Sequence, residues 1–88
     1  MMLDLIKFIV EQFASSPETI EYITEEDGDE IKVTIVLEES DMGKVIGRQG
    51  RIAKALRTIV KAASVKEGKK YAIEIRSKEE NGVKEQVE

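Results

Sequence analysis

Two glycines three residues apart separate two helical patterns in the stretch GKVIGRQGRIAK, residues 43–54. A short helical segment is expected to end near Ile46, and a longer helix is expected from about Arg51 to Ala63. Because glycine lacks a Cβ, it permits both a sharp turn between helices and the close approach of another backbone. The stretch therefore predicts two helices joined by a tight turn whose main chain is open to a ligand.

The longer helix is expected to present one apolar face and one basic face. On a helical wheel, the apolar side comprises Ile52, Leu56, Ile59, Val60 and Ala63, and the opposite side comprises Arg51, Lys54, Arg57 and Lys61. Every charged residue between Met42 and Lys66 is basic, although the whole chain carries a net charge of −4. A local basic block can bind a polyanion at a defined place. The positive end of the helix dipole, which follows the glycines, favours a phosphate there.

Phosphate-binding motifs of other kinds fit the stretch less well. After Gly47 come Arg48 and Gln49, with no Ser or Thr placed to hold magnesium as in a P-loop, and the dinucleotide-binding pattern G-x-G-x-x-G is missing. A lone G-x-x-G is more often a structural turn, and a basic stripe can simply solvate a helix face. Taken one at a time, the glycines and the cations leave both of these interpretations open.

The first part of the chain predicts a helix followed by a β-hairpin. Apolar residues at helical spacing indicate a helix over residues 2–14, which the sequence Ser-Ser-Pro at 15–17 ends. Residues 19–24 and 30–38 are typical of strands, and the second run alternates apolar and polar side chains. Because Asp27-Gly28 between them is a turn sequence, we expect an antiparallel hairpin.

A third strand completes the predicted sheet. Residues 71–76 alternate in polarity and follow the two helices, the first of which is expected to begin with Ser40 as its N-cap. A right-handed crossover would lay this strand parallel to the second one. The predicted fold class is α+β, in the order α-β-β-α-α-β, with a three-stranded mixed sheet and helices packed on one face. One domain is expected over residues 1–77, and residues 78–88 are expected to be a disordered acidic tail.

The composition excludes several classes of site. The chain has no Cys and no His, so it lacks thiolate ligands for zinc or iron–sulfur clusters and the commonest general base. No pair of nucleophile and base is visible, and apolar runs such as Ile35 to Leu37 are far shorter than the roughly 20 residues of a membrane span. We expect a soluble, cytoplasmic protein that is not an enzyme and has no metal, cofactor or membrane partner.

The complete string VIGRQGRIAK closely resembles the I-G-x-x-G signature of the KH domain, and the predicted order of elements resembles the type II, bacterial form of that fold. The resemblance covers about residues 2–76 and extends to the small stand-alone bacterial KH proteins. It implies a single-stranded RNA-binding protein whose groove holds about four unpaired nucleotides while the G-x-x-G loop clamps their backbone.

The resemblance also assigns RNA-binding residues by position. The loop would form the clamp, two isoleucines would contribute the apolar floor, and three cations would contact flanking phosphates. In that order, the candidates are Gly47, Arg48, Gln49 and Gly50, then Ile46 and Ile52, then Lys44, Arg51 and Lys54. The strand edge near Val33 to Val36 would form the opposite wall. Arg57 and Lys61 are left open, as the end of the groove or as positions beyond it.

An acidic loop, EEDGDE at residues 25–30, would flank this groove although its ligand is a polyanion. A single module with few phosphate contacts should bind RNA only modestly, so a second copy or a partner would be needed to raise the effective concentration. The resemblance implies both self-association and a KhpB-like RNA-binding partner. It further implies an RNA chaperone or post-transcriptional regulator that acts in cell elongation and peptidoglycan homeostasis.

Two other functions stay open at this point. One is a protein-interaction adapter, a dimerisation or partner-docking module whose nucleic-acid groove is weak or vestigial. The other is an enzyme, although the acidic residues of the chain lie in runs typical of a solvated surface. The adapter predicts that a short RNA leaves the NMR signals of residues 44–54 unchanged, whereas RNA binding predicts that they shift.

Overall fold

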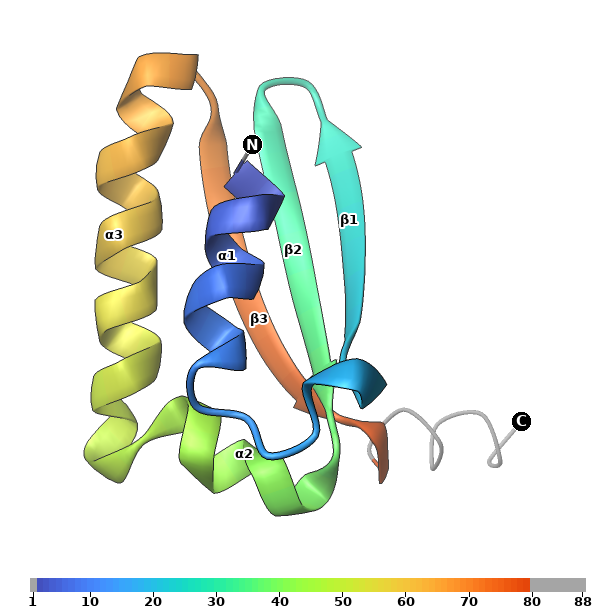
Figure 1. Ribbon diagram of the computed structural model, residues 1–88. Coiled ribbons are helices and arrows are strands. Elements are labelled where there is room, and N and C mark those ends of the chain that lie inside the picture. The colour runs from blue at the N-terminus through green and yellow to red at the C-terminus, as the bar shows by residue number, and fades with distance from the viewer. Residues whose placement is uncertain (1, 80–88) are drawn as a thin grey trace.

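The chain runs through a helix, a hairpin, two further helices and a final strand in the computed structural model, which describes residues 2–79 (Figure 1). In chain order the elements are α1 (Met2–Glu11), η1 (Pro17–Thr19), β1 (Glu21–Asp27), β2 (Glu30–Leu37), α2 (Glu39–Ile46), η2 (Arg48–Gly50), α3 (Arg51–Glu67) and β3 (Lys70–Ser77). This is the predicted order α-β-β-α-α-β, with short 3₁₀ helices η1 and η2 added at two connections.

The three strands form a mixed sheet in the order β1-β2-β3. β1 runs antiparallel to β2 with Asp27 opposite Glu30, so Gly28 and Asp29 form a two-residue hairpin turn. Gly28 has a φ of 67°, the positive value that favoured two-residue turns require. β3 runs parallel to β2 along the whole length of both strands. The mixed sheet predicted from the crossover is therefore confirmed.

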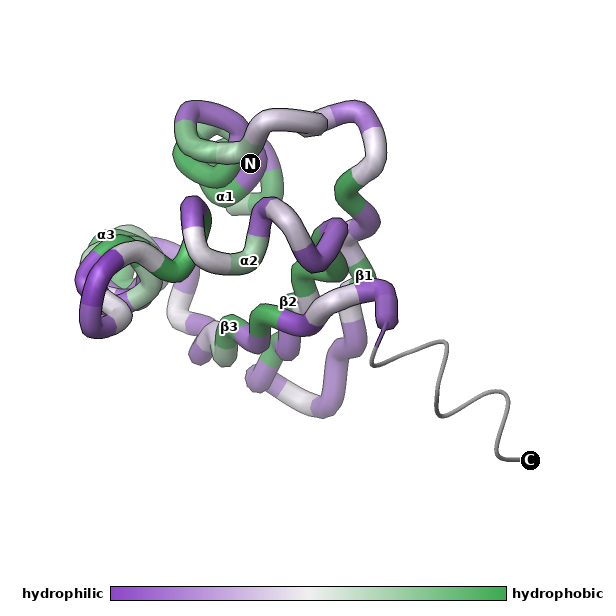
Figure 2. Tube along the Cα trace, turned by 90° about the horizontal axis from the view of Figure 1, so that it is seen from below, coloured by the Kyte–Doolittle hydropathy of each residue, from purple (hydrophilic) through white to green (hydrophobic). Residues whose placement is uncertain are grey.

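β2 lies at the centre of the sheet because it is the most apolar strand. Ile31, Val33, Ile35 and Leu37 are buried on the face that packs against the core, whereas Lys32 is exposed and Thr34 is partly buried on the other face. α1, α2 and α3 all cover one face of the sheet (Figure 2). Between the layers lie the core side chains of Met2, Ile6, Val10, Ile31, Val33, Ile35, Leu37, Val45, Leu56, Val60 and Ile73. The predicted packing of the helices on one face is confirmed.

α1 and α2 differ from the prediction at their ends. α1 ends at Glu11, and residues 12 and 13 form a turn rather than a continuation of the helix. α2 begins at Glu39 with Glu38 as its N-cap residue, so the prediction of Ser40 as the N-cap is wrong. The reason is that β2 already ends at Leu37, and the extended backbone of Glu38 turns the chain directly into the helix.

α3 is longer than predicted and is turned differently about its axis. It continues to Glu67, where Gly68 adopts a left-handed φ of 68° and ends it. Its buried residues are Ala53, Leu56, Val60 and Ser64. Ile59, which the wheel places on the apolar face, is 44% exposed. Small side chains at 53 and 64 let the helix lie close to its neighbours, so steric fit as well as hydrophobicity sets its orientation.

The predicted disordered tail covers residues 78–88, and residues 80–88 of it lie outside the described residues. β3 ends at Ser77, which is buried. The Nζ atom of Lys78, the next residue, lies 3.7 Å from a carboxylate oxygen of Glu38. The domain boundary after residue 77 stays a prediction.

Candidate nucleic-acid interface

The turn between α2 and α3 uses backbone conformations that suit glycine. The N–H of Gly47 closes α2 by donating to Gly43 O at 2.9 Å. Gly47 itself has φ 81° and ψ 172°, a region that is essentially restricted to glycine. Gln49 and Gly50 follow with φ values of 56° and 73°. Three of the four residues 47–50 therefore have a positive φ where the chain passes from α2 into α3.

The two glycines are required for different reasons. A Cβ added to Gly47 would lie 2.7 Å from Cγ1 and 3.0 Å from the backbone nitrogen of Ile52, closer than such atoms approach. A Cβ added to Gly50 would meet nothing within 4 Å. Gly50 therefore needs only its left-handed φ, and the space in front of it is open. The main chain at Gly50 is accessible to a large ligand such as a phosphodiester.

The nine residues selected from the sequence lie together on this turn and on the helix ends beside it. Arg48, Gln49, Arg51 and Lys54 are exposed, whereas Ile46 and Ile52 are partly buried and belong partly to the packing of the two helices. The arrangement has exposed cations around an accessible main chain, with apolar surface next to it. It is suited to a ligand that combines phosphates with flat apolar rings.

Lys44 is tied to the preceding loop by its side chain. Its Nζ donates to Ser15 Oγ, in the segment between α1 and η1. The same segment is anchored by Asp41, a residue that the sequence analysis does not select. The Asp41 carboxylate is buried and accepts hydrogen bonds from Ser15 N at 2.9 Å and Ser16 N at 3.0 Å. These two hydrogen bonds hold the pKa of Asp41 below its ordinary value.

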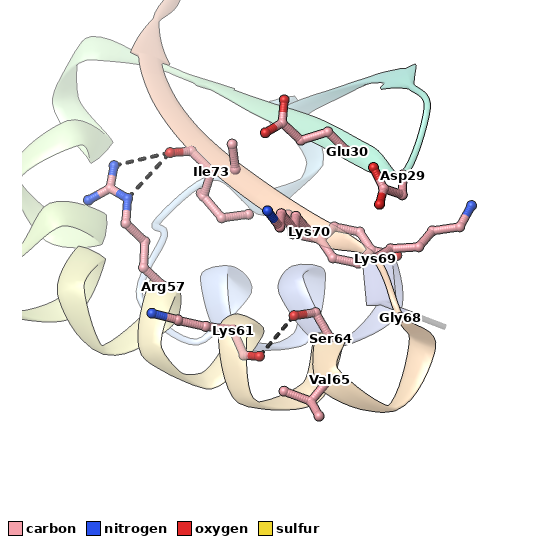
Figure 3. A pocket seen from close by; sticks show the side chains of 12 residues that line it. Asp29, Glu30, Arg57, Lys61, Ser64, Val65, Gly68, Lys69, Lys70 and Ile73 are labelled. Carbon is pink, nitrogen blue, oxygen red and sulfur yellow. Dashed lines mark hydrogen bonds between the residues drawn. The ribbon is translucent and has the colours of Figure 1, made fainter.

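A groove lies between α3 and the free edge of β3 (Figure 3). It encloses a cavity of about 750 Å³, within the range of roughly 300 to 1,000 Å³ typical of ligand sites. α3 contributes Arg57, Lys61, Ser64 and Val65, β3 and the residues before it contribute residues 68–73, and the hairpin contributes Asp29 and Glu30. Both cations that the sequence leaves open, Arg57 and Lys61, therefore line this groove.

The opposite wall of the groove is β3, so the wall expected at Val33 to Val36 is wrong. Those residues belong to β2, whose two edges are hydrogen-bonded to β1 and β3. Within residues 2–79, β3 pairs only with β2 and keeps one free edge. Arg57 reaches that edge, where its Nε and Nη2 donate to Ile73 O at 3.3 and 3.2 Å.

Basic side chains line the groove along its whole length. Lys54, Arg57 and Lys61 lie at helical spacing on one side of α3 and lead from the turn into the cavity. We call these three residues the basic stripe. At the far end, Asp29 and Glu30 of the hairpin stand beside Lys69 and Lys70. Cations therefore line the groove from the turn to the hairpin, and acidic side chains join them only at the far end.

The far end of the groove is held by interactions between β3, the hairpin and the end of α3. Lys69 Nζ lies 2.7 Å from a carboxylate oxygen of Glu26, an ion pair that lowers the pKa of Glu26. The hydroxyl of Tyr71 donates to Glu67 at 2.6 Å, and this hydrogen bond, with burial, raises the pKa of Tyr71 to about 12. Tyr71 therefore stays protonated at neutral pH.

No group of three or more acidic residues among residues 2–79 could hold a metal ion. None of the helices within that range is long and apolar enough to cross a membrane.

A mixed three-stranded sheet, helices on one face, the order α-β-β-α-α-β and a G-x-x-G turn between the last two helices together define a type II KH domain. The sequence model of the KhpA/KhpB KH domain matches residues 3–75. The chain therefore belongs to the KhpA/KhpB KH-domain family.

Curated relatives share almost their whole length with this chain. The RNA-binding protein KhpA of Clostridium perfringens is 47% identical over 75 residues, which cover 84% of this chain and 99% of the relative. The RNA-binding protein KhpA of Bacillus subtilis is 47% identical over 72 residues, 82% of this chain and 89% of the relative. That of Clostridium acetobutylicum is 43% identical over 75 residues, with 84% and 99% covered. No solved structure matches the chain.

Proposed function

We propose that this chain binds single-stranded RNA, with the sugar-phosphate backbone at the G-x-x-G turn and the bases along the groove between α3 and β3. The observation that carries the proposal is the open main chain at Gly50, which stands at the start of the basic stripe. The turn and the basic stripe lead into a groove whose other wall is the free edge of β3. The relatives that bear the name RNA-binding protein agree with it.

Each candidate residue has a role in this proposal. Gly47 and Gly50 bring the main chain close to the phosphates, and Arg48 and Gln49 extend over them as the clamp. Lys44, Arg51 and Lys54 neutralise flanking phosphates. Ile46 and Ile52 offer partly buried apolar surface to the neighbouring bases. About four nucleotides fit such a site.

The proposal includes partners, since one groove of this size makes few phosphate contacts. We infer self-association or association with a KhpB-like RNA-binding protein, because a second groove raises the effective concentration of RNA at the first. The cellular role that follows is that of a cytoplasmic, non-enzymatic RNA chaperone or post-transcriptional regulator. In this role it would act in cell elongation and peptidoglycan homeostasis.

A protein-interaction adapter is the second candidate function. It is favoured by exposed apolar side chains on α3, where Ile59, outside the groove, is 44% exposed and Val65, at the groove, is 77% exposed. Such side chains are suited to a protein partner. An adapter would use this surface and would not need the open main chain at Gly50.

An NMR titration with a short unstructured RNA tests the two functions against each other. RNA binding predicts shift changes at residues 44–54 and along the groove at Arg57 and Ile73, with little change at Lys32 on the other face of the sheet. The adapter predicts no shift changes in either region. Shifts confined to the hairpin and β1 would contradict the proposed groove.

A further inference from the structure

Arg57 is held over the free edge of β3 by two hydrogen bonds to one carbonyl group (Figure 3). Nε and Nη2 form one side of the planar guanidinium, and both donate to Ile73 O. The end of the guanidinium, formed by Nη1 and Nη2, keeps two parallel N–H donors. Arg57 forms no ion pair within residues 2–79. The side chain is thus a fixed, two-pronged donor inside the groove.

The same contact removes an acceptor from the strand edge. Peptide groups alternate in direction along a strand, and Lys70 N donates toward the hairpin, to Asp29 O at 2.8 Å. The carbonyl group of Ile73, three residues later, points the opposite way, toward α3, where it accepts the hydrogen bond from Arg57. Because Ile73 O is already bonded, the amino group of a base finds no open acceptor there. At this position the groove offers donors.

The position of Arg57 beyond the turn favours a base over a phosphate as its ligand. Lys54 and the turn lie toward one end of the basic stripe, about 5 Å from Arg57 along the helix axis. At the other end of the same cavity, the carboxylates of Asp29 and Glu30 are offset by Lys69 and Lys70, so the phosphates have no stronger attraction there than at the turn. A strand of RNA can keep its phosphates near the turn and place an uncharged base in the cavity.

We propose that Arg57 gives the groove a preference for bases that carry two adjacent hydrogen-bond acceptors, cytosine and guanine, over adenine and uracil. This inference rests on the proposed RNA-binding function. Cytosine presents O2 and N3 side by side, and guanine presents O6 and N7, the pair that arginine binds bidentately. Adenine and uracil have no two adjacent acceptors. The donors left on Arg57 therefore match only the first two bases.

The test measures the affinity of the full chain for tetranucleotides by fluorescence polarisation. The set consists of UUUU and its variants with a single C, G or A at each position. We expect C or G at one position to bind about fivefold or more tightly than U or A, the lower end of discrimination by one bidentate pair. Arg57→Lys keeps the positive charge but loses the two parallel N–H donors of the guanidinium. This variant should therefore bind all members of the set with the same affinity.

Lys54→Ala serves as the matched comparison on the same face of α3. It removes a phosphate contact, so it should weaken every member of the set equally and keep the preference. If the unaltered chain binds without preference, or Arg57→Lys retains the preference, this inference is wrong while RNA binding stands. If the chain binds no member of the set, both proposals are wrong.

Two modified bases identify the atoms involved. A pyrimidin-2-one base keeps O2 and N3 but lacks the amino group of cytosine, so it should bind as tightly as cytosine. A 7-deazaguanine base lacks N7, so it should lose the advantage of guanine. Loss of affinity with pyrimidin-2-one would mean that the amino group is recognised instead, which would overturn the role of Arg57.

Discussion

Gly47 and Ile52 are in contact across the turn, so that a Cβ on residue 47 would lie 2.7 Å from Ile52 Cγ1. Ile52 lies in the first turn of α3 and is partly buried, and its backbone nitrogen would also be only 3.0 Å from that Cβ. The backbone cannot move aside without moving the start of the helix. The contact therefore sets the direction in which α3 leaves the turn.

Substitution of the two glycines should have unequal effects on stability. Gly50→Asn places a residue that tolerates left-handed φ in open space, so it should cost about 1 kcal/mol or less. Gly47→Asn adds both a glycine-only backbone conformation and the overlap with Ile52, so it should cost more than about 2 kcal/mol. Urea unfolding followed by circular dichroism measures both. Equal losses would show that the contact with Ile52 does not constrain the turn.

Charge reversal in the clamp should separate binding from stability. Replacing both Arg48 and Gln49 with Asp puts two carboxylates where the phosphates are proposed to lie, while both glycines stay. RNA affinity should fall at least tenfold, and the melting temperature should hardly change, because both side chains are exposed. Lys66→Asp, on another side of α3, is the control and should bind nearly as the unaltered chain does. Undiminished binding by the double variant would contradict the clamp.

The salt dependence of binding should count the phosphates in contact. Two or three neutralised phosphates give a slope of about −1.5 to −2 in log K against log salt for a single-stranded ligand. Lys54→Ala should make the slope shallower by up to about 0.7, and Lys66→Ala should leave it unchanged. A slope near zero would remove the electrostatic role of the stripe. One steeper than about −4 would mean that RNA contacts far more than this groove.

The order of elements and the position of the turn are predictable because both depend on local patterns. Each pattern involves only residues that are near one another in the sequence. The patterns are the alternation along residues 30–38, the helical spacing along residues 2–14 and the pair of glycines. The wall assigned to Val33 to Val36 comes from resemblance and conflicts with the predicted topology, which already places that strand between the other two. The topology is right, so the free edge belongs to β3.

The contacts of Arg57 and Asp41 are not predictable in the same way. Arg57 meets Ile73 only because α3 turns Ala53 and Ser64 toward the interior and leaves Ile59 outside, a rotation decided by packing. Asp41 is a polar residue on the buried side of a short helix, four residues before Val45, and that spacing alone marks it as unusual. Its backbone partners lie 25 and 26 residues away, beyond the reach of local patterns.

The rotation of α3 can be checked with a matched pair of truncations. Leu56 is 2% exposed and belongs to the core, so Leu56→Ala should cost about 2 to 5 kcal/mol of unfolding free energy. Ile59, which the helical wheel places on the same face, is 44% exposed, so Ile59→Ala should cost less than about 1 kcal/mol. Chemical denaturation of both variants gives the comparison. Similar costs would place Ile59 in the core, against the structure.

The last prediction concerns acid stability and Asp41. Its folded pKa lies below the ordinary value because the ionised carboxylate accepts the N–H groups of Ser15 and Ser16. Above the unfolded pKa of about 3.9 both states are ionised, and the stabilisation is complete. As the pH falls below that value, the unfolded state binds its proton first, so the contribution is lost as the pH approaches the folded pKa.

Asp41→Asn should therefore be less stable than the unaltered chain at pH 7, because its amide can accept the two hydrogen bonds only in part. The difference should shrink steadily below about pH 4. Unfolding curves of both proteins between pH 2 and 7 measure it. Glu26, whose pKa is also lowered, supplies a comparison on the exposed surface, where Glu26→Gln should change stability little. A difference between Asp41→Asn and the unaltered chain that is the same at pH 2 and pH 7 would show that the charge of Asp41 does not hold the loop.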